Sequence, residues 1–288
     1  MGYSAYSVSS RAIRANSAGY YTKSRDEVFE QSKYHSVHAL MMPKGIKLRE
    51  ACDSKEHPNT TPIQLYLDVT GSMGYIPHEM IKDGLPKLVG TLIQNGIADV
   101  SLMFGAIGDH ECDRGPLQIG QFESGDAEMD MWLKRVWLEQ GGGANMGESY
   151  LLAWYFAGYH TRIDSFDKRN QKGFVFTIGD EPCLLNLPVS AVKEIMGDTA
   201  VGQGNYTREE LLTKAQAHNH VYHIHVNHEG RNCHDTWKQI LGQNLIEVYD
   251  YKQISQTLSN IILSHQVNGI IAPVTKLTES EQEPKITL

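Results

Sequence analysis

Short apolar runs alternate with helical segments from residue 62 to residue 263, and this alternation restricts the fold more than any other feature. The alternation predicts strands at residues 63–67, 98–107, 117–122, 172–178, 220–226 and 245–249. It predicts helices at residues 77–94, 126–138, 147–159, 189–196, 207–218 and 251–263. Alternating strands and helices form parallel sheets with helices on both faces. We therefore expect a doubly wound, mainly parallel α/β sheet of about six strands.

One strand of this sheet is expected to be antiparallel. The link between strands 98–107 and 117–122 is short and begins with the turn residues Gly108 and Asp109. A parallel crossover needs a dozen or more residues, usually including a helix. The segment 117–122 is therefore predicted to be an antiparallel strand at the edge of the sheet.

The composition divides the chain into three parts. Residues 1–61 form an N-terminal arm, which begins with many Ser, Tyr, Ala and Arg residues and ends in a polar connector from residue 49. Residues 62–264 form the α/β domain, and residues 265–288 form a polar tail. The arm has two interpretations: it packs on the domain, or it reaches a partner or a neighbouring copy.

The composition is that of a globular protein and disfavours two kinds of partner. The chain has 288 residues, of which 41% are hydrophobic and 21% charged, and its net charge of −8 disfavours nucleic acid and anionic membranes. No apolar run approaches the ~20 residues that span a bilayer, and the first residues lack the apolar core of a signal peptide.

The four cysteines form no CxxC pair, which fits a reduced cytoplasm. We expect a cytoplasmic protein.

Three oxygen-bearing side chains follow the first predicted strand. Asp68, Thr70 and Ser72 stand at alternate positions, and Gly71 and Gly74 let the backbone turn. Alternate side chains of an extended segment point to one side, and open α/β sheets bind ligands at the carboxyl ends of their strands. Helix capping and turn formation are the alternative use of these residue types. We interpret the three side chains as half of a divalent-metal site.

Two later loops should meet this turn at the same edge of the sheet. Asp180 directly follows the strand at 172–178, and a glycine-rich loop at 141–149 contains Asn145 and Glu148. A simple turn is the alternative for Asp180, and capping of the next helix is the alternative for Asn145 and Glu148. Hydroxyl and carboxylate oxygens are hard ligands, which suit Mg²⁺ or Mn²⁺ better than Zn²⁺.

The order and composition of these loops resemble those of the von Willebrand factor A (VWA) domain. Its metal-ion-dependent adhesion site (MIDAS) is written DxSxS, followed by a Thr on a second loop and an Asp on a third. Asp68-Val-Thr70-Gly-Ser72 matches the first element, and Asp180 matches the third. The second loop departs from the pattern, because Ala144 stands where the Thr is expected. The second-loop ligand is then Asn145 or Glu148.

This resemblance implies a VWA/Rossmann-like fold and a non-enzymatic function. The implied metal is Mg²⁺ or Mn²⁺, and a partner protein would complete its coordination with a carboxylate. The chain looks more like bacterial or phage relatives than secreted adhesion domains. In such relatives the module often works with a MoxR-type AAA+ ATPase or in a larger assembly.

Two other functions compete with this prediction. A structural, self-assembling protein, such as a virion-associated component, would carry a metal site that is only stabilising or vestigial. A phosphohydrolase of the haloacid-dehalogenase type would also place an aspartate after its first strand, but Thr70 occupies the position of the acid/base aspartate. No GxSxG or GxxxxGK[ST] motif is present. We therefore predict that the protein is not an enzyme.

Two further groups of side chains have a metal-related alternative. Histidines and a cysteine gather between residues 218 and 234, and His223 and His225 share one face of a strand, which would suit zinc. Histidines with satisfied hydrogen bonds inside the sheet are the favoured interpretation. Asp109 follows a strand end and either orients metal-bound water or belongs to a solvated turn, which is favoured.

Overall fold

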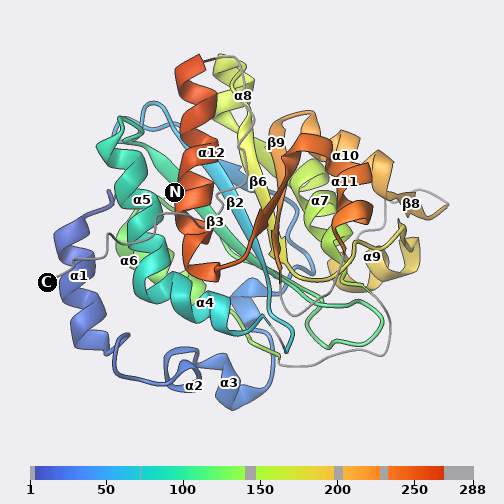
Figure 1. The fold of residues 1–288 in the computed structure, drawn as a ribbon, viewed down its shortest axis with the longest axis horizontal. Helices are drawn as coiled ribbons and strands as arrows, with labels where there is room; N and C mark the ends of the chain where they lie inside the picture. The colour runs from blue at the N-terminus through green and yellow to red at the C-terminus, as the bar shows by residue number, and fades with distance from the viewer. Residues whose placement is uncertain (1–3, 72, 140–146, 198–203, 228–232, 269–288) are drawn as a thin grey trace, which may run out of the picture.

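The central sheet has six strands in the order β10–β9–β6–β2–β3–β4 (Figure 1). The computed structural model describes residues 4–71, 73–139, 147–197, 204–227 and 233–268. All neighbouring strands are parallel except β3 and β4. The strands are β2 (Thr61–Asp68), β3 (Val100–Ile107), β4 (Leu117–Ile119), β6 (Gly173–Gly179), β9 (Asn219–Val226) and β10 (Leu245–Val248). The predicted doubly wound α/β sheet with one antiparallel edge strand is confirmed.

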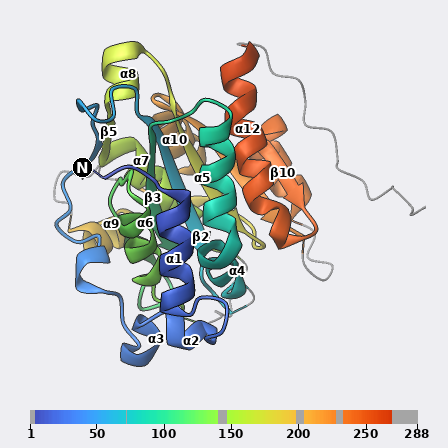
Figure 2. The same ribbon diagram turned by 90° about the vertical axis from the view of Figure 1, so that its left-hand side faces the viewer.

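Helices cover both faces of this sheet (Figure 2). Two apolar clusters fill the space between the layers. One face carries α5 (Leu85–Gln94), α6 (Asp126–Lys134) and α12 (Ile254–Asn268), with α1 (Val8–Ala18) outside them. The other face carries α7 (Tyr150–Tyr159), α9 (Val189–Met196), α10 (Arg208–Gln216) and α11 (His234–Leu241). The shorter helices are α2 (Arg25–Val28), α3 (Gln31–Tyr34), α4 (Tyr75–Glu79) and α8 (Asp164–Arg169), with 3₁₀ turns at Ala39–Met41, Gly242–Asn244 and Tyr251–Gln253.

The central strand β2 shows why the sheet is parallel. Its residues from Pro62 to Asp68 are all buried. Leu65 belongs to the cluster on one face and Tyr66 to the cluster on the other. The buried Gln64 accepts a hydrogen bond from the Tyr66 hydroxyl at 2.8 Å, so these two polar side chains inside the strand satisfy each other. A strand that is apolar on both faces needs helices on both sides, which parallel crossovers provide.

Two element predictions need correction, and some elements were not predicted. The predicted helix at 126–138 ends at Lys134, because the next turn bonds to β4 instead: Trp137 N–H donates to Gln118 Oε1 at 2.8 Å. The predicted polar connector begins with a strand, β1 (Arg49–Ala51), which pairs in parallel with β5 (Thr161–Ile163). Helix α11 and a small ribbon of β7 (Asn186–Leu187) and β8 (Tyr206–Thr207) were not predicted.

The contact between β9 and α12 makes stability depend on pH. The His220 and His265 rings lie 3.9 Å apart, and His265 Nε2 and the Tyr222 hydroxyl are hydrogen-bonded at 2.7 Å. Burial, with His265 and Lys172 nearby, lowers the pKa of His220 to about 4. The unfolded chain therefore binds a proton between about pH 6.5 and 4 that the folded chain does not.

Stability should consequently fall as the pH falls through this window. We expect His220 to account for about 1 kcal/mol of the loss between pH 7 and pH 5, since the ring is only partly buried. Urea unfolding of wild type and His220→Gln at both pH values measures this. The same pH dependence in both proteins would contradict the assignment.

Candidate functional site

Asp68 lies at the carboxyl end of the central strand and is 1% exposed. Its Oδ1 accepts hydrogen bonds from Thr70 N at 2.9 Å and from Thr70 Oγ1 at 2.7 Å. Its Oδ2 accepts a hydrogen bond from the Tyr150 hydroxyl at 3.0 Å. The first two bonds form a local side-chain turn, which fixes the carboxylate relative to the backbone. Ser72, the third predicted oxygen ligand of this turn, lies outside the described residues.

Gly179, at the end of β6, makes room for this contact. Leu67 of β2 pairs with Ile178 of β6, so the ends of the two strands lie side by side. A Cβ atom added to Gly179 would lie 1.8 Å from the Tyr150 hydroxyl oxygen and 3.0 Å from Asp68 Oδ2. Only glycine therefore allows the phenol of Tyr150 to reach Asp68. Asp180 follows at once and is 1% exposed, and its charge acts on Asp68.

Glu148 belongs to a segment that bonds to the ends of two strands. Its N–H donates to the Pro182 carbonyl at 3.1 Å, just after β6. Ser149 N–H donates to the Gly108 carbonyl at 3.3 Å, just after β3. The Glu148 side chain is 6% exposed, and its Oε2 has no hydrogen-bond partner among the described residues. Asn145, the other predicted second-loop ligand, lies outside the part of the chain that the structure describes.

Asp109 is a fourth acidic residue at the carboxyl edge of the sheet. It is 1% exposed, so the prediction of a solvated turn is wrong. Asp109 Oδ1 accepts a hydrogen bond from Glu111 N at 3.0 Å, whereas Oδ2 is buried without a hydrogen-bond partner in the described structure. Asp113 Oδ2 accepts a bond from Asp109 N at 2.7 Å and shapes this turn.

Burial and neighbouring negative charges raise the pKa values of two of these carboxylates, Glu148 and Asp68. Burial raises the pKa of Glu148 to about 9, and the negative charges of Asp68, Asp113, Asp109 and Asp180 act in the same direction. Burial also raises the pKa of Asp68 to about 6, although its bonds from Thr70 oppose this. Among the described residues, no Lys or Arg forms an ion pair with Asp68, Asp109 or Glu148. A bound cation would compensate these buried charges.

The donor set fits a divalent cation bound by hard oxygen ligands. Among the described residues, Glu148 Oε2 and Asp109 Oδ2 are buried oxygens without hydrogen-bond partners, and Thr70, 5% exposed, places its hydroxyl beside Asp68. Within the described residues, however, no three His, Cys, Asp or Glu side chains form a compact metal-binding group. A metal at this edge would therefore also need hydroxyl oxygens and water, as Mg²⁺ accepts.

The histidine group is largely used in packing. His223 stacks on Trp237 with ring centroids 3.6 Å apart, and its Nδ1 and Thr177 Oγ1 are hydrogen-bonded at 2.9 Å. Burial lowers the pKa of His223 well below its usual value, which keeps the ring neutral. His228 lies outside the described residues, and the described part of this group forms no metal-binding set. The alternative prediction of a zinc site therefore gains no support.

Tyr150 and Gly179 are the site residues that the sequence analysis missed. Tyr150 begins α7, a helix that is apolar on almost every side. The sequence pattern alone therefore indicates a core residue at this position and not a site residue. A buried tyrosine hydroxyl normally has a hydrogen-bond partner, and that rule is the one signal that could have indicated a polar group near the start of α7. Nothing in the sequence identifies Gly179 as more than the end of a strand, because its role depends on two side chains from other segments.

Removal of the Tyr150 hydroxyl tests the bond to Asp68. In the absence of metal, Tyr150→Phe should lower the free energy of unfolding by about 1–3 kcal/mol, because Asp68 Oδ2 loses its donor in a buried site. Urea unfolding in EDTA measures this change. Tyr249→Phe is the control, since Tyr249 is 65% exposed and should give no measurable change. Equal effects of the two substitutions would contradict the assigned contact.

Comparison with known proteins reveals only remote structural similarity. No protein-family model matches the chain, and no curated protein matches it. Solved structures similar to it include the pilus adhesin SpaC from Lactobacillus rhamnosus GG, with 11% identity, a TM-score of 0.44, and coverage of 76% of this chain and 30% of that one. Proximal thread matrix protein 1 from the mussel byssus is similar over 73% of this chain and 48% of its own, with 11% identity and a TM-score of 0.48.

A second structure of the mussel protein has a zinc-occupied MIDAS motif. It is 13% identical, with a TM-score of 0.44 and coverage of 74% of this chain and 48% of that one. The chain thus spans less than half the length of each of these proteins. At such identities and TM-scores the similarity does not identify a family or a function.

Proposed function

We propose that this chain is a VWA-like module that binds a protein partner through a Mg²⁺-dependent site at the carboxyl edge of its sheet. The observation that carries the proposal is the group of buried acidic residues around Asp68, in which Glu148 and Asp109 each keep a buried oxygen without a hydrogen-bond partner in the described structure. Burial of several carboxylates without a compensating cation is costly. Mg²⁺, or Mn²⁺ in its place, would supply the missing positive charge.

Asp68, Thr70 and Asp180 are the residues that we propose to hold the metal, together with Ser72. Glu148 is our choice for the second loop, with Asn145 as the alternative. A hard divalent cation keeps several water ligands in such a site. A carboxylate of the partner protein can replace one of them, as the resemblance to the MIDAS implies.

A non-enzymatic function agrees with the surroundings of Asp68. Both of its carboxylate oxygens accept hydrogen bonds, and Thr70 stands where a phosphohydrolase would need an acid/base aspartate.

No helix in the described part of the chain is long and apolar enough to cross a membrane. We also propose a cytoplasmic location, with the four cysteines reduced. A MoxR-type AAA+ ATPase is one partner class that we propose.

A structural, self-assembling role is the second candidate. The Tyr150 hydroxyl satisfies Asp68 Oδ2 without a metal, as a vestigial site would allow. Apolar side chains are also concentrated on the surface of the arm. Of the large hydrophobic side chains that the described structure exposes, most lie before residue 50: Val8, Ile13, Tyr21, Tyr34, Leu40, Met42 and Leu48.

A pull-down from lysate in Mg²⁺ and in EDTA separates the two candidates. The wild-type chain should retain its partner in Mg²⁺ only, and Asp68→Ala should lose it in both buffers. Asp164→Asn is the control, because Asp164 is a buried acid that pairs with Lys168 at 2.7 Å outside the site. Identical partners for wild type and Asp68→Ala would exclude the site as the recognition surface.

Light scattering of the purified chain tests self-assembly. Oligomers that form without metal in wild type and dissociate in the Ile13→Ser variant would favour a self-assembling role.

A further inference from the structure

The helix that follows the Asp68 turn is interrupted by a π-turn at Met80–Gly84, between α4 and α5. The Leu85 N–H donates to the Met80 carbonyl, five residues back, and Pro86 has no N–H to donate. In a regular α-helix, these two residues would bond to the carbonyls of Ile81 and Lys82. Both carbonyls therefore lose their usual donor within the helix.

The N-terminal arm provides the missing donors. Arg11 of α1 donates from Nη2 to the Ile81 carbonyl and from Nη1 to the Lys82 carbonyl at 3.2 Å. The Tyr21 hydroxyl also donates to the Lys82 carbonyl, at 3.3 Å. Arg11 is 1% exposed, and its Nη2 forms an ion pair with Asp130 Oδ1 of α6 at 3.2 Å. This guanidinium thus joins α1, α6 and the π-turn, and Figure 2 shows α1 beside α5 and α6.

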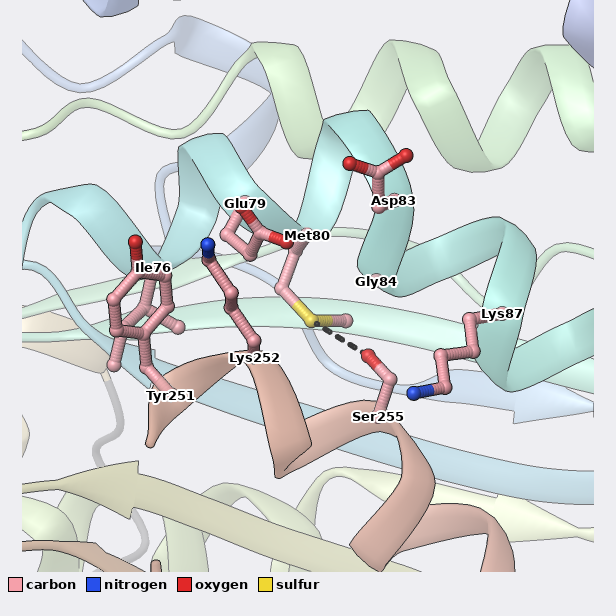
Figure 3. A pocket seen from close by; sticks show the side chains of 9 residues that line it. All are labelled: Ile76, Glu79, Met80, Asp83, Gly84, Lys87, Tyr251, Lys252 and Ser255. Carbon is pink, nitrogen blue, oxygen red and sulfur yellow. Dashed lines mark hydrogen bonds between the residues drawn. The ribbon is translucent and has the colours of Figure 1, made fainter. Parts of the chain in front are cut away.

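Met80 and Gly84 of the π-turn pack against α12. Figure 3 shows Met80 and Gly84 facing Ser255, whose hydroxyl lies 3.5 Å from Met80 Sδ, at a cavity of about 170 Å³. A Cβ atom added to Gly84 would lie 2.8 Å from both Met80 Sδ and Ser255 Oγ. The geometry of the turn is therefore matched to α12 as well as to Arg11.

The arm also contacts the end of the Asp68 turn. A Cβ atom added to Gly74 would lie 3.1 Å from Arg25 Nη1, so the arm passes directly beside the start of α4. Val28 and Phe29 of the arm are buried in the same apolar cluster as Met73 and Ile76. The arm therefore contacts the segment that follows the Asp68 turn at two points, at Gly74 and at the π-turn.

We propose that Arg11 is a positioning residue for the turn that carries Asp68 and Thr70. A π-turn holds one more residue than the α-helical turn it replaces. If the π-turn changed to a regular α-helical turn, α4 would rotate relative to α5 by about 100° and shift by about 1.5 Å. Arg11 stabilises the π-turn because it binds the Ile81 and Lys82 carbonyls, which the π-geometry and Pro86 leave without their usual donors. Without Arg11, the start of α4 and the preceding turn lose their defined position. The effect of Arg11 on metal binding rests on the function proposed above, whereas the effect of Arg11 on the position of the turn does not.

Amide hydrogen exchange in the full-length, metal-free chain tests the position of the turn. Arg11→Met should speed the exchange of the Thr70 and Met73 amides at least about tenfold, because their bonds to Asp68 Oδ1 and the Thr70 carbonyl open more often. Arg11→Lys, a milder change that keeps the charge near Asp130, should have a smaller effect in the same direction. Arg14→Met is the matched control: Arg14 binds Asp126 and Asp130 but neither helix carbonyl, and its loss should leave both amides unchanged.

The Pro86→Ala variant separates two possible effects of Arg11→Met, a change in the π-turn and a general loosening of the arm. In Pro86→Ala, the new N–H can bond to the Lys82 carbonyl, so Arg11→Met should change the exchange of the two amides less than in wild type. Unchanged exchange in Arg11→Met, or equal acceleration in Arg14→Met, would overturn the proposal. Titration with Mn²⁺ adds an independent result: Arg11→Met should raise the dissociation constant about tenfold and Arg14→Met should not. If wild type binds no Mn²⁺, the proposed function fails, while hydrogen exchange still decides the role of Arg11.

Discussion

Gly179→Ala is expected to lower the free energy of unfolding by about 3 kcal/mol, among the largest effects of any one-carbon change in this chain. The added Cβ would lie 1.8 Å from the Tyr150 hydroxyl oxygen, and both residues are buried. The clash must displace Tyr150, which then loses its bond to Asp68. Urea unfolding of wild type and variant measures the change.

Two further variants make this prediction specific. Tyr150→Phe removes the oxygen that clashes, so the double variant should be at least about 1 kcal/mol more stable than the sum of the single effects predicts. Gly90→Ala is the control, because a Cβ atom at Gly90 meets nothing within 4 Å and helical alanine is favoured over glycine. Strictly additive effects of Gly179→Ala and Tyr150→Phe would show that the two residues do not share one contact.

Asp68→Asn should have opposite effects on the metal-free and metal-bound states. Without metal, the uncharged amide removes a buried negative charge next to Asp180 and Glu148, and the amide oxygen still accepts the bonds from Thr70. We therefore expect the variant to be more stable than wild type in EDTA at pH 8, by on the order of 1–3 kcal/mol. With Mg²⁺, wild type should gain stability and the variant should not.

Thermal unfolding in EDTA and in Mg²⁺ measures both effects. Asp164→Asn is again the control, because it should destabilise the protein in both buffers without changing the response to Mg²⁺. If Asp68→Asn is less stable than wild type in EDTA, the negative charge of Asp68 is compensated inside the protein. If its response to Mg²⁺ equals that of wild type, Asp68 is not a metal ligand.

The sheet could be predicted from the sequence because each central strand is buried on both faces. Residues 63–67 of β2 read as a continuous apolar run except for Gln64, and Tyr66 compensates Gln64 within the same strand. The short link before β4 was enough to predict antiparallel pairing. Strand β1 was not predictable in this way, because its polar residues Arg49 and Glu50 pair with β5 more than 100 positions away.

The site was predictable only in part, for a similar reason. The position of Asp68 at a strand end follows from the local pattern, and so does its contact with Thr70. The contribution of Tyr150 and Gly179 depends on the register of β2 against β6 and on the start of α7. The π-turn is another example: Pro86 marks it locally, but the compensating Arg11 lies some 70 positions earlier.

Binding of a hard divalent cation at the carboxyl edge of this sheet depends, in our proposal, on Asp68. The decisive measurement is titration of the purified full-length chain with Mn²⁺, followed by electron paramagnetic resonance. Wild type should bind a single Mn²⁺ ion per chain, which Mg²⁺ displaces, and Asp68→Asn should bind none. A free-ion spectrum with wild type, or equal binding by wild type and Asp68→Asn, would show that Asp68 holds no metal.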